Sequence, residues 1–210
     1  MKNAISIFIL FASALVFSSC EFMGLGLQED YEYTPRTLDP HINMTVMEFL
    51  QSSPGHQLDS LLSAIQYAGL TDEFSKPGRT FFFLHNLAIY RLDSKGKVDV
   101  NCYFGKYTVN GKPATKWKDY PVEQVRNLLL YHMVEGEYTY DNLTPDNIEL
   151  ITLSTAAKNK MLLRIVNDRD SKVTINEFFG SIKVVRARTS NLLATDGTIH
   201  IVGDFAEYGP

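Results

Sequence analysis

The stretch 125–139 constrains the fold most, because it begins with the spacing of a helix and ends with the composition of a strand. One face of this helix is expected to carry residues that recur at intervals of three and four, namely Val125, Leu128, Leu129 and His132. Gly136 is predicted to end the helix, since glycine enters the left-handed region at little cost. Residues 137–140 then have the aromatic and β-branched content of a strand. A Tyr131-His132 pair is therefore expected at the end of a buried helix, just before the chain enters a sheet.

Length and composition are those of an ordinary globular domain. The chain has 210 residues, of which 45% are hydrophobic and 21% charged, and its formal net charge is −4. This length favours one domain, and the lack of a basic patch argues against a nucleic-acid partner. No apolar run of about 18 residues follows the N-terminal region, so no later transmembrane helix is expected.

The N-terminus has the pattern of a targeting segment. An apolar run of 13 residues over 5–17 is too short to span a membrane comfortably. The Ser18-Ser19-Cys20 sequence that follows resembles the lipobox of bacterial lipoproteins, although Phe17 departs from the smaller aliphatic residue usual there. We predict a signal peptide over 1–20, a lipid on Cys20 and a flexible tether over 21–37. The expected location is the cell envelope, at the outer membrane on its periplasmic or surface side; signal cleavage without lipid is the alternative.

Helical signals dominate the first part of the remaining chain. Thr45 and Glu48 have the spacing of a capping box. Apolar residues over 58–68 follow the helical template until Gly69. Residues 80–84 then form an apolar run of strand length, which predicts a strand buried on both faces.

The segment 93–120 is irregular and rich in aromatic residues, among them Tyr103, Tyr107 and Trp117. Residues 98–109 suit a strand or a hairpin, with Asn110-Gly111 as its tight turn. Aromatic residues in such a segment either hold a glycan or protein partner or pack the loop onto its own domain. The sequence leaves both interpretations open.

Strand signals dominate the last part of the chain. Segments of strand length and composition are 148–153, 161–166, 172–176, 182–185, 192–195 and 198–202. Asp196-Gly197 lies between the last two and suits a type I′ turn. Because helices come early and hairpins late, the pattern predicts an α+β fold with a mainly antiparallel sheet.

Three stretches, in this order, resemble the fasciclin-type domain. Residues 80–89 resemble its first strand and Asn-x-Ala turn, although Leu84 and His85 stand where Pro-Thr is usual. Residues 130–139 resemble its Tyr-His box, and 194–202 resemble its final box. The resemblance covers residues 38–210 and implies one domain: a wedge-shaped β-sandwich flanked by short helices, with an aromatic-rich insertion over 93–120.

The same resemblance implies an extracellular role in adhesion or in binding proteins, matrix or glycans. In some members the Tyr-His box is linked to receptor contact, a role that carries onto Tyr131 and His132. The alternative is that His132, on the apolar face of its helix, is buried and hydrogen-bonded. For His200, which alternates with Ile199 and Ile201, exposure and packing both stay open.

No residue pattern predicts catalysis, a metal site or a cofactor. The five histidines lack metal-ligand spacing, no Gly-x-Ser-x-Gly elbow occurs, and Cys102 lies in an irregular loop. We predict a cell-envelope lipoprotein that mediates adhesion or protein–protein interaction. Its candidate contact residues are Tyr131, His132, Trp117, Tyr103 and Tyr107. The alternative function is that of a surface glycan-binding accessory protein of a carbohydrate uptake system; the ligand, the oligomeric state and the role of Cys102 stay open.

Overall fold

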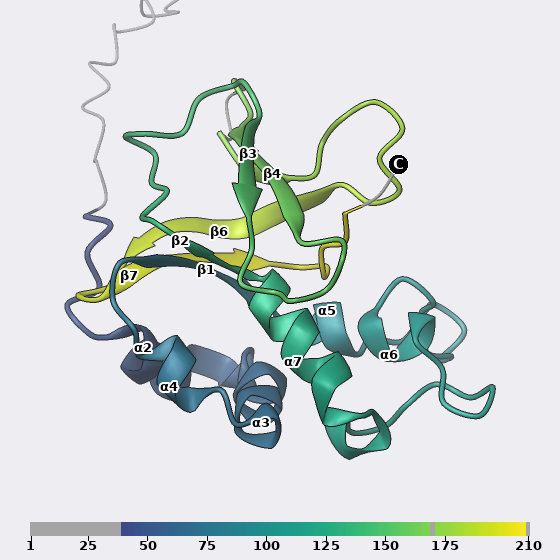
Figure 1. Ribbon diagram of the computed structural model, residues 1–210. Helices are drawn as coiled ribbons and strands as arrows, with labels where there is room; N and C mark the ends of the chain where they lie inside the picture. Colours follow the sequence, from purple (N-terminus) through teal and green to yellow (C-terminus); the bar gives the residue numbers. More distant parts are fainter. Residues whose placement is uncertain (1–38, 169–170, 209–210) are drawn as a thin grey trace, which may run out of the picture. The chain divides into compact units, whose positions relative to one another are not determined.

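A seven-stranded sheet organises the computed structural model, which describes residues 39–168 and 171–208 (Figure 1). Its strands lie in the order β2 (Met133–Glu135), β1 (Arg79–Leu84), β7 (Gly197–Val202), β6 (Val185–Leu193), β5 (Val173–Ile175), β4 (Lys160–Ile165) and β3 (Ile148–Ile151). β1 and β7 are parallel, and the other neighbouring pairs are antiparallel. The predicted α+β fold with a mainly antiparallel sheet is therefore confirmed. The predicted signal peptide, Cys20 and the tether over 21–37 fall outside the described residues.

The sheet folds back on itself at β6, which gives the predicted sandwich. The start of β6 pairs with β5, whereas the rest pairs with β7 across two irregularities in register. Such bulges bend a strand and increase its twist. The two ends of the sheet come together where Val134 forms a bridge with Thr152. There the N–H of Leu153 donates to the carbonyl of Met133 over 3.0 Å, so the sheet is nearly closed.

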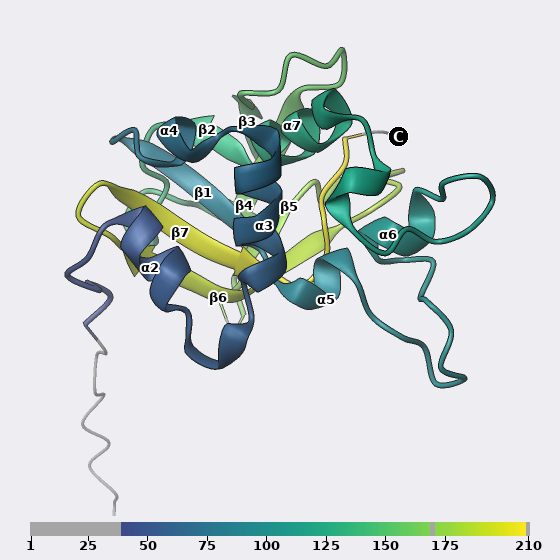
Figure 2. The same cartoon turned by 90° about the horizontal axis from the view of Figure 1, so that it is seen from below.

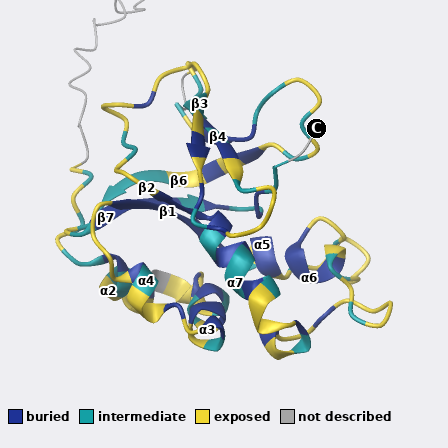
Figure 3. Cartoon of the chain, viewed as in Figure 1, coloured by how far each residue is buried: buried dark blue, intermediate teal, exposed yellow. Residues whose placement is uncertain are grey.

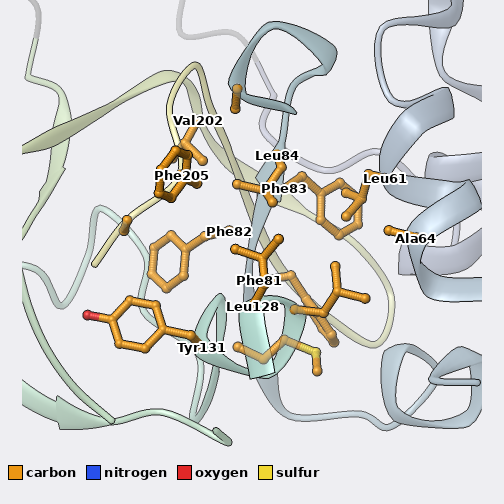
Figure 4. Packing of buried hydrophobic residues seen from close by; sticks show 14 of the residues in the cluster. Leu61, Ala64, Phe81, Phe82, Phe83, Leu84, Leu128, Tyr131, Val202 and Phe205 are labelled. Atoms are coloured by element: carbon orange, nitrogen blue, oxygen red, sulfur yellow. The ribbon is translucent and has the colours of Figure 1, made fainter. Parts of the chain in front are cut away.

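Short helices cover one face of β1 and β7 (Figure 2). They are α2 (Val46–Ser52), α3 (Asp59–Ala68), α4 (Thr71–Phe74) and α7 (Val122–Tyr131). On this face Phe81 packs against Phe74 of α4 at a ring-centroid distance of 5.5 Å, and Phe83 against Phe49 of α2 at 6.3 Å. Phe82 points to the other face and stacks on the ring of a β7 histidine. β1 is thus buried on both faces, as predicted; Figure 3 shows the strand coloured as buried, and Figure 4 shows its phenylalanine side chains within the core.

Local capping explains where the first two helices begin and end. Thr45 and Glu48 form the predicted capping box at the start of α2. Gly69 adopts a φ of 63° and ends α3, also as predicted. The remaining short helices are η1 (Pro54–His56), α5 (Asn86–Ile89), α6 (Tyr103–Lys106) and η2 (Trp117–Asp119).

The change from helix to strand occurs earlier than predicted. α7 ends at Tyr131, and β2 lies before Gly136 rather than after it. The reason is pairing: residues 133–135 are paired with β1. Gly136, at a φ of 94°, then ends the strand while its N–H donates to the carbonyl of Gly78 over 2.9 Å. The predicted strand at 137–140 is therefore wrong.

The predicted type I′ turn at Asp196-Gly197 is also wrong, since neither residue has the positive φ that this turn requires. Gly197 is instead the first residue of β7. A Cβ atom there would lie 2.7 Å from the carbonyl oxygen of Arg79, so close approach of two strands demands glycine. The Asp196 carboxylate accepts a hydrogen bond from the N–H of Val46 over 2.8 Å, which ties the hairpin to the start of α2.

Two further segments differ from prediction. Asn110 and Gly111 do form a tight turn with φ of 51° and 74°, but the flanking hairpin is a single bridge and the preceding residues form α6. Residues 182–184 form a loop rather than a strand, because β6 begins only at Val185. This loop belongs to the surface described next.

Candidate functional site

His132 lies buried at the C-terminal end of α7, where it joins the helix to the last segment of the chain. Its Nδ1 lies 2.8 Å from the carbonyl of Leu128, and its Nε2 accepts a hydrogen bond from the N–H of Ala206 over 2.9 Å. The ring is therefore neutral, with the proton on Nδ1. Burial, and to a lesser degree the charge of Lys183, lower the pKa of His132 to about 4. Both ring nitrogens are satisfied inside the domain, so the burial expected from helical spacing is what the structure shows.

Tyr131 is buried next to it and is also satisfied internally (Figure 4). Its hydroxyl donates to the carbonyl of Lys160 over 2.8 Å and accepts from the Asn176 amide over 2.9 Å. Burial raises the pKa of Tyr131 to about 12. The same Asn176 amide donates to the carbonyl of Glu207 over 2.8 Å. The Tyr-His pair thus holds the C-terminal segment 203–208 rather than presenting a polar surface.

His200, whose environment the sequence left open, is fully buried on β7. Its Nε2 lies 2.9 Å from the carbonyl of Tyr138, and its Nδ1 accepts from the N–H of Asn191 over 3.2 Å. Its ring stacks on Phe82 with 5.6 Å between the ring centroids. Burial lowers the pKa of His200 to about 4.

The aromatic residues of the insertion 93–120 pack mainly onto their own domain. Trp117 is buried, and its indole N–H donates to the carbonyl of Ser60 over 2.8 Å. Tyr103 is buried as well, with its ring centroid 5.7 Å from that of Trp117 and 5.3 Å from that of Phe205. Tyr107 is half-buried. Of the three predicted contact residues in this segment, Tyr107 has the most accessible side chain.

A groove runs along the C-terminal segment, between that segment and α7. It consists of two adjoining hollows of about 340 and 420 Å³, which share Tyr107, Asn127 and Glu207. The first hollow is further lined by Tyr131, Ser154, Ala156, Lys158, Ile182, Ala206 and Tyr208, and the second by Tyr103, Gln124, Leu128 and Phe205. The predicted contact residues Tyr131, Tyr103 and Tyr107 thus all reach this groove. The sequence does not reveal this groove, because its walls come from five separate segments.

Most polar groups of the groove are already paired. The Glu207 carboxylate contacts the ammonium group of Lys106 and the hydroxyl of Tyr107. The side-chain amide oxygen of Asn127 accepts hydrogen bonds from the hydroxyls of Ser154 and Thr155 over 3.1 and 3.2 Å. Two donors of the groove stay available at its rim: the side-chain N–H groups of Asn127 and the ammonium group of the exposed Lys158.

An exposed apolar tip adjoins the groove, in the loop between β5 and β6. Phe179 is fully exposed, Ile182 is 58% exposed and Val184 is 41% exposed. We call these three residues the apolar tip. Ile182 belongs both to the tip and to the lining of the groove. The sequence pattern that could have indicated this tip is Phe178-Phe179-Gly180, two aromatic residues before a glycine. In the structure Gly180 adopts a φ of 84°.

The described residues offer few other functional groups. Cys102 is a buried free thiol. Over 39–168 and 171–208, no group of three or more His, Cys, Asp or Glu side chains has an arrangement suited to a metal ion. In the same part of the chain, every helix is too short or too polar to cross a membrane.

Comparison with known proteins places this architecture. The family model of the fasciclin domain matches residues 56–205. A solved structure described as a FAS1 domain pair from the insect cell adhesion molecule fasciclin I matches with a TM-score of 0.51 and 16% sequence identity. The match covers 77% of this chain and 50% of that structure, so the chain spans half the length of the pair. No curated protein sequence matches the chain. With a family model over most of its length and the fold in common, the chain belongs to the fasciclin domain family.

Proposed function

We propose that this chain is a lipid-anchored protein of the cell envelope, at the outer membrane, whose fasciclin domain mediates adhesion or protein–protein contact. Fasciclin domains are associated with adhesion and protein interaction and are generally not enzymes. The apolar run before Cys20 supports the anchor. The proposal assigns a binding role and no catalytic step.

One structural observation carries the proposal: the entry of the chain into the domain and the apolar tip lie at opposite ends of β6. His41 forms a bridge with Leu193 at the end of β6, whereas the tip immediately precedes Val185 at its start. The eight intervening steps of about 3.3 Å would separate these points by about 26 Å in a straight strand, and the bulges of β6 shorten this distance. The domain therefore carries the apolar tip at the opposite end of β6 from the bridge at His41.

Cell fractionation tests the anchor. Cys20→Ala removes the only thiol in the predicted lipidation sequence, so the variant should move from the membrane fraction to the soluble fraction. Cys102→Ala is the matched control, because Cys102 is a buried core residue, and it should stay with the membrane. Identical fractionation of wild type and Cys20→Ala contradicts lipid anchoring.

Adhesion is tested by deleting the gene and restoring it. We expect cells without the protein to lose aggregation or attachment to a surface, and the wild-type gene to restore it. Cys20→Ala should restore it poorly, since a released protein cannot hold the cell to its partner. Unchanged adhesion in the deletion strain contradicts the proposed function.

A further inference from the structure

We propose that the apolar tip and the adjoining groove form one docking surface for a protein partner, which contributes an apolar side chain next to a carboxylate. This inference deepens the proposed function and rests on it. It names the surface that makes the contact and the chemistry of the segment that is bound.

The tip and the groove are one continuous surface. Ile182 lines the groove with Tyr208, Ala156 and Lys158, while more than half of its side chain stays exposed. An apolar side chain lying over Ile182 therefore enters the first hollow, of about 340 Å³, without crossing a polar barrier. A hollow of this size accepts one or two large side chains of a peptide.

The loop that carries the tip is fixed at both of its ends to the C-terminal segment. At one end the rings of Phe178 and Tyr208 are 5.8 Å apart. At the other end the Lys183 ammonium lies 3.4 Å from the centroid of the Phe205 ring and donates to the carbonyl of Asn101 over 3.1 Å. With both ends anchored, the exposure of the phenylalanine between them is imposed by the fold. Apolar residues held exposed together mark an interaction site.

The charges at the groove define the second half of the ligand. The charge of Glu207 is balanced by Lys106, and its other oxygen accepts a hydrogen bond from Tyr107, so its repulsion of an anion is reduced. Lys158 lines the same hollow, and its ammonium group has no hydrogen bond or ion pair within the described part of the chain. The side-chain oxygen of Asn127 already accepts two hydrogen bonds, which leaves the N–H groups of the same side-chain amide to donate. Two free donors and no free acceptor from these three residues match a carboxylate of the partner.

A protein partner fits better than a bilayer. The tip lies at the start of β6, whereas the first described residues of the chain pair with the end of that strand. The apolar part is three residues beside a hollow with fixed donors, which suits one side chain of defined shape. Interface anchors of this kind combine a pocket, an apolar contact and a few placed polar groups.

Peptide binding to the purified mature chain tests the surface. The probe is an array of 12-residue peptides that carry Phe or Leu beside Glu, with a second copy in which each Glu is replaced by Gln. We expect a set of Glu peptides to bind at least tenfold more tightly than their Gln copies. Ile182→Ser should weaken the binding at least tenfold. Its matched control is Ile151→Ser, because Ile151 is 56% exposed on β3 and lies outside the groove.

Lys158→Ala should reduce the advantage of Glu over Gln peptides to less than twofold, whereas Lys112→Ala, which follows the Asn110-Gly111 turn and does not line the groove, should preserve it. The inference is overturned if no peptide binds, if Ile182→Ser and Ile151→Ser behave alike, or if the array stays silent while phosphatidylglycerol vesicles or a glycan array bind in a tip-dependent manner. If peptide binding fails while the deletion strain still loses adhesion, the surface is wrong and the proposed function stands. If the deletion strain adheres normally, the proposed function itself fails.

Discussion

Mild acid should destabilise the protein through its buried histidines, and His132 tests this most directly. The pKa of His132 is lowered from 6.5 to about 4 because the ring is fully buried. The unfolded chain therefore binds the proton more tightly than the folded protein. The contribution of neutral His132 to the free energy of unfolding is fully present above about pH 6.5 and is lost as the pH falls from there towards 4. Below about pH 4 the protonation of His132 changes the stability no further.

The magnitude follows from the size of the shift. At pH 5 the loss per histidine is about 1.5 pH units times 1.36 kcal/mol, or about 2 kcal/mol. His200 has the same lowered pKa and adds about as much, so the free energy of unfolding should fall by about 4 kcal/mol between pH 7 and pH 5. Burial lowers the pKa of His85 as well, which acts in the same direction. The carboxylates with lowered pKa, such as Glu73 and Glu177, weaken only at lower pH.

Urea unfolding of the mature chain at pH 7 and pH 5 measures this loss. His132→Gln should unfold more easily at pH 7, because the side chain no longer fits its site, but it should lose only about 2 kcal/mol on acidification. His56→Gln, on the exposed η1 segment, is the matched control and should keep the wild-type dependence. A wild-type loss that His132→Gln reproduces in full refutes the reasoning. If the variant does not fold, an NMR titration of His132 in the wild type decides, and a pKa near 6.5 refutes it.

Three substitutions test other parts of the fold. Gly197→Ala should destabilise the protein by about 1–3 kcal/mol, because the new Cβ meets the carbonyl of Arg79 at 2.7 Å; a urea midpoint equal to that of the wild type contradicts this. Asp196→Ala should cost about 1 kcal/mol through loss of the acceptor for the Val46 N–H, seen as a lower melting temperature, and an unchanged melting temperature denies the capping role. Trp117→Ala should cost about 3–5 kcal/mol in calorimetry as a core residue, whereas a stable variant that loses a ligand means that Trp117 is a contact residue.

The sequence predicts correctly those elements whose start, end or burial is decided by residues a few positions apart. The apolar run around Phe82 has strand composition and few polar side chains, and it forms β1, which is buried along its whole length. The capping box at Thr45 and the glycine at 69 act over a few residues, so their effect is visible without the rest of the fold.

Two of the wrong predictions, at the end of α7 and at Gly197, share one cause, which is pairing between segments far apart in the chain. Residues 133–135 read as the end of a helix until β1 supplies hydrogen-bond partners. Gly197 reads as a turn residue, but the glycine is required by the neighbouring strand 118 positions earlier, at Arg79. Periodicity within one segment contains no information about which segment lies beside it.

The groove could not be predicted for the same reason. Asn127 comes from α7, Lys158 from the loop before β4, Ile182 from the tip and Glu207 from the C-terminal segment. None of these residues stands in a recognisable motif. The Tyr-His pair was visible as a motif and as part of an apolar helical face, but its partners in the C-terminal segment were not.

The structure suggests how the Tyr-His pair can matter for contact although its polar atoms are hydrogen-bonded inside the domain. His132 accepts a hydrogen bond from Ala206, and Tyr131 shares the Asn176 amide with the carbonyl of Glu207. Both residues therefore fix the C-terminal segment, which forms one wall of the groove. The loop with the apolar tip is anchored to the same segment through the contact of Lys183 with the Phe205 ring. We therefore expect removal of either side chain to loosen that wall and to weaken binding at the proposed surface, although the exposed apolar residues are intact. On this interpretation His132 is a positioning residue, whereas Tyr131 both holds the C-terminal segment and lines the first hollow.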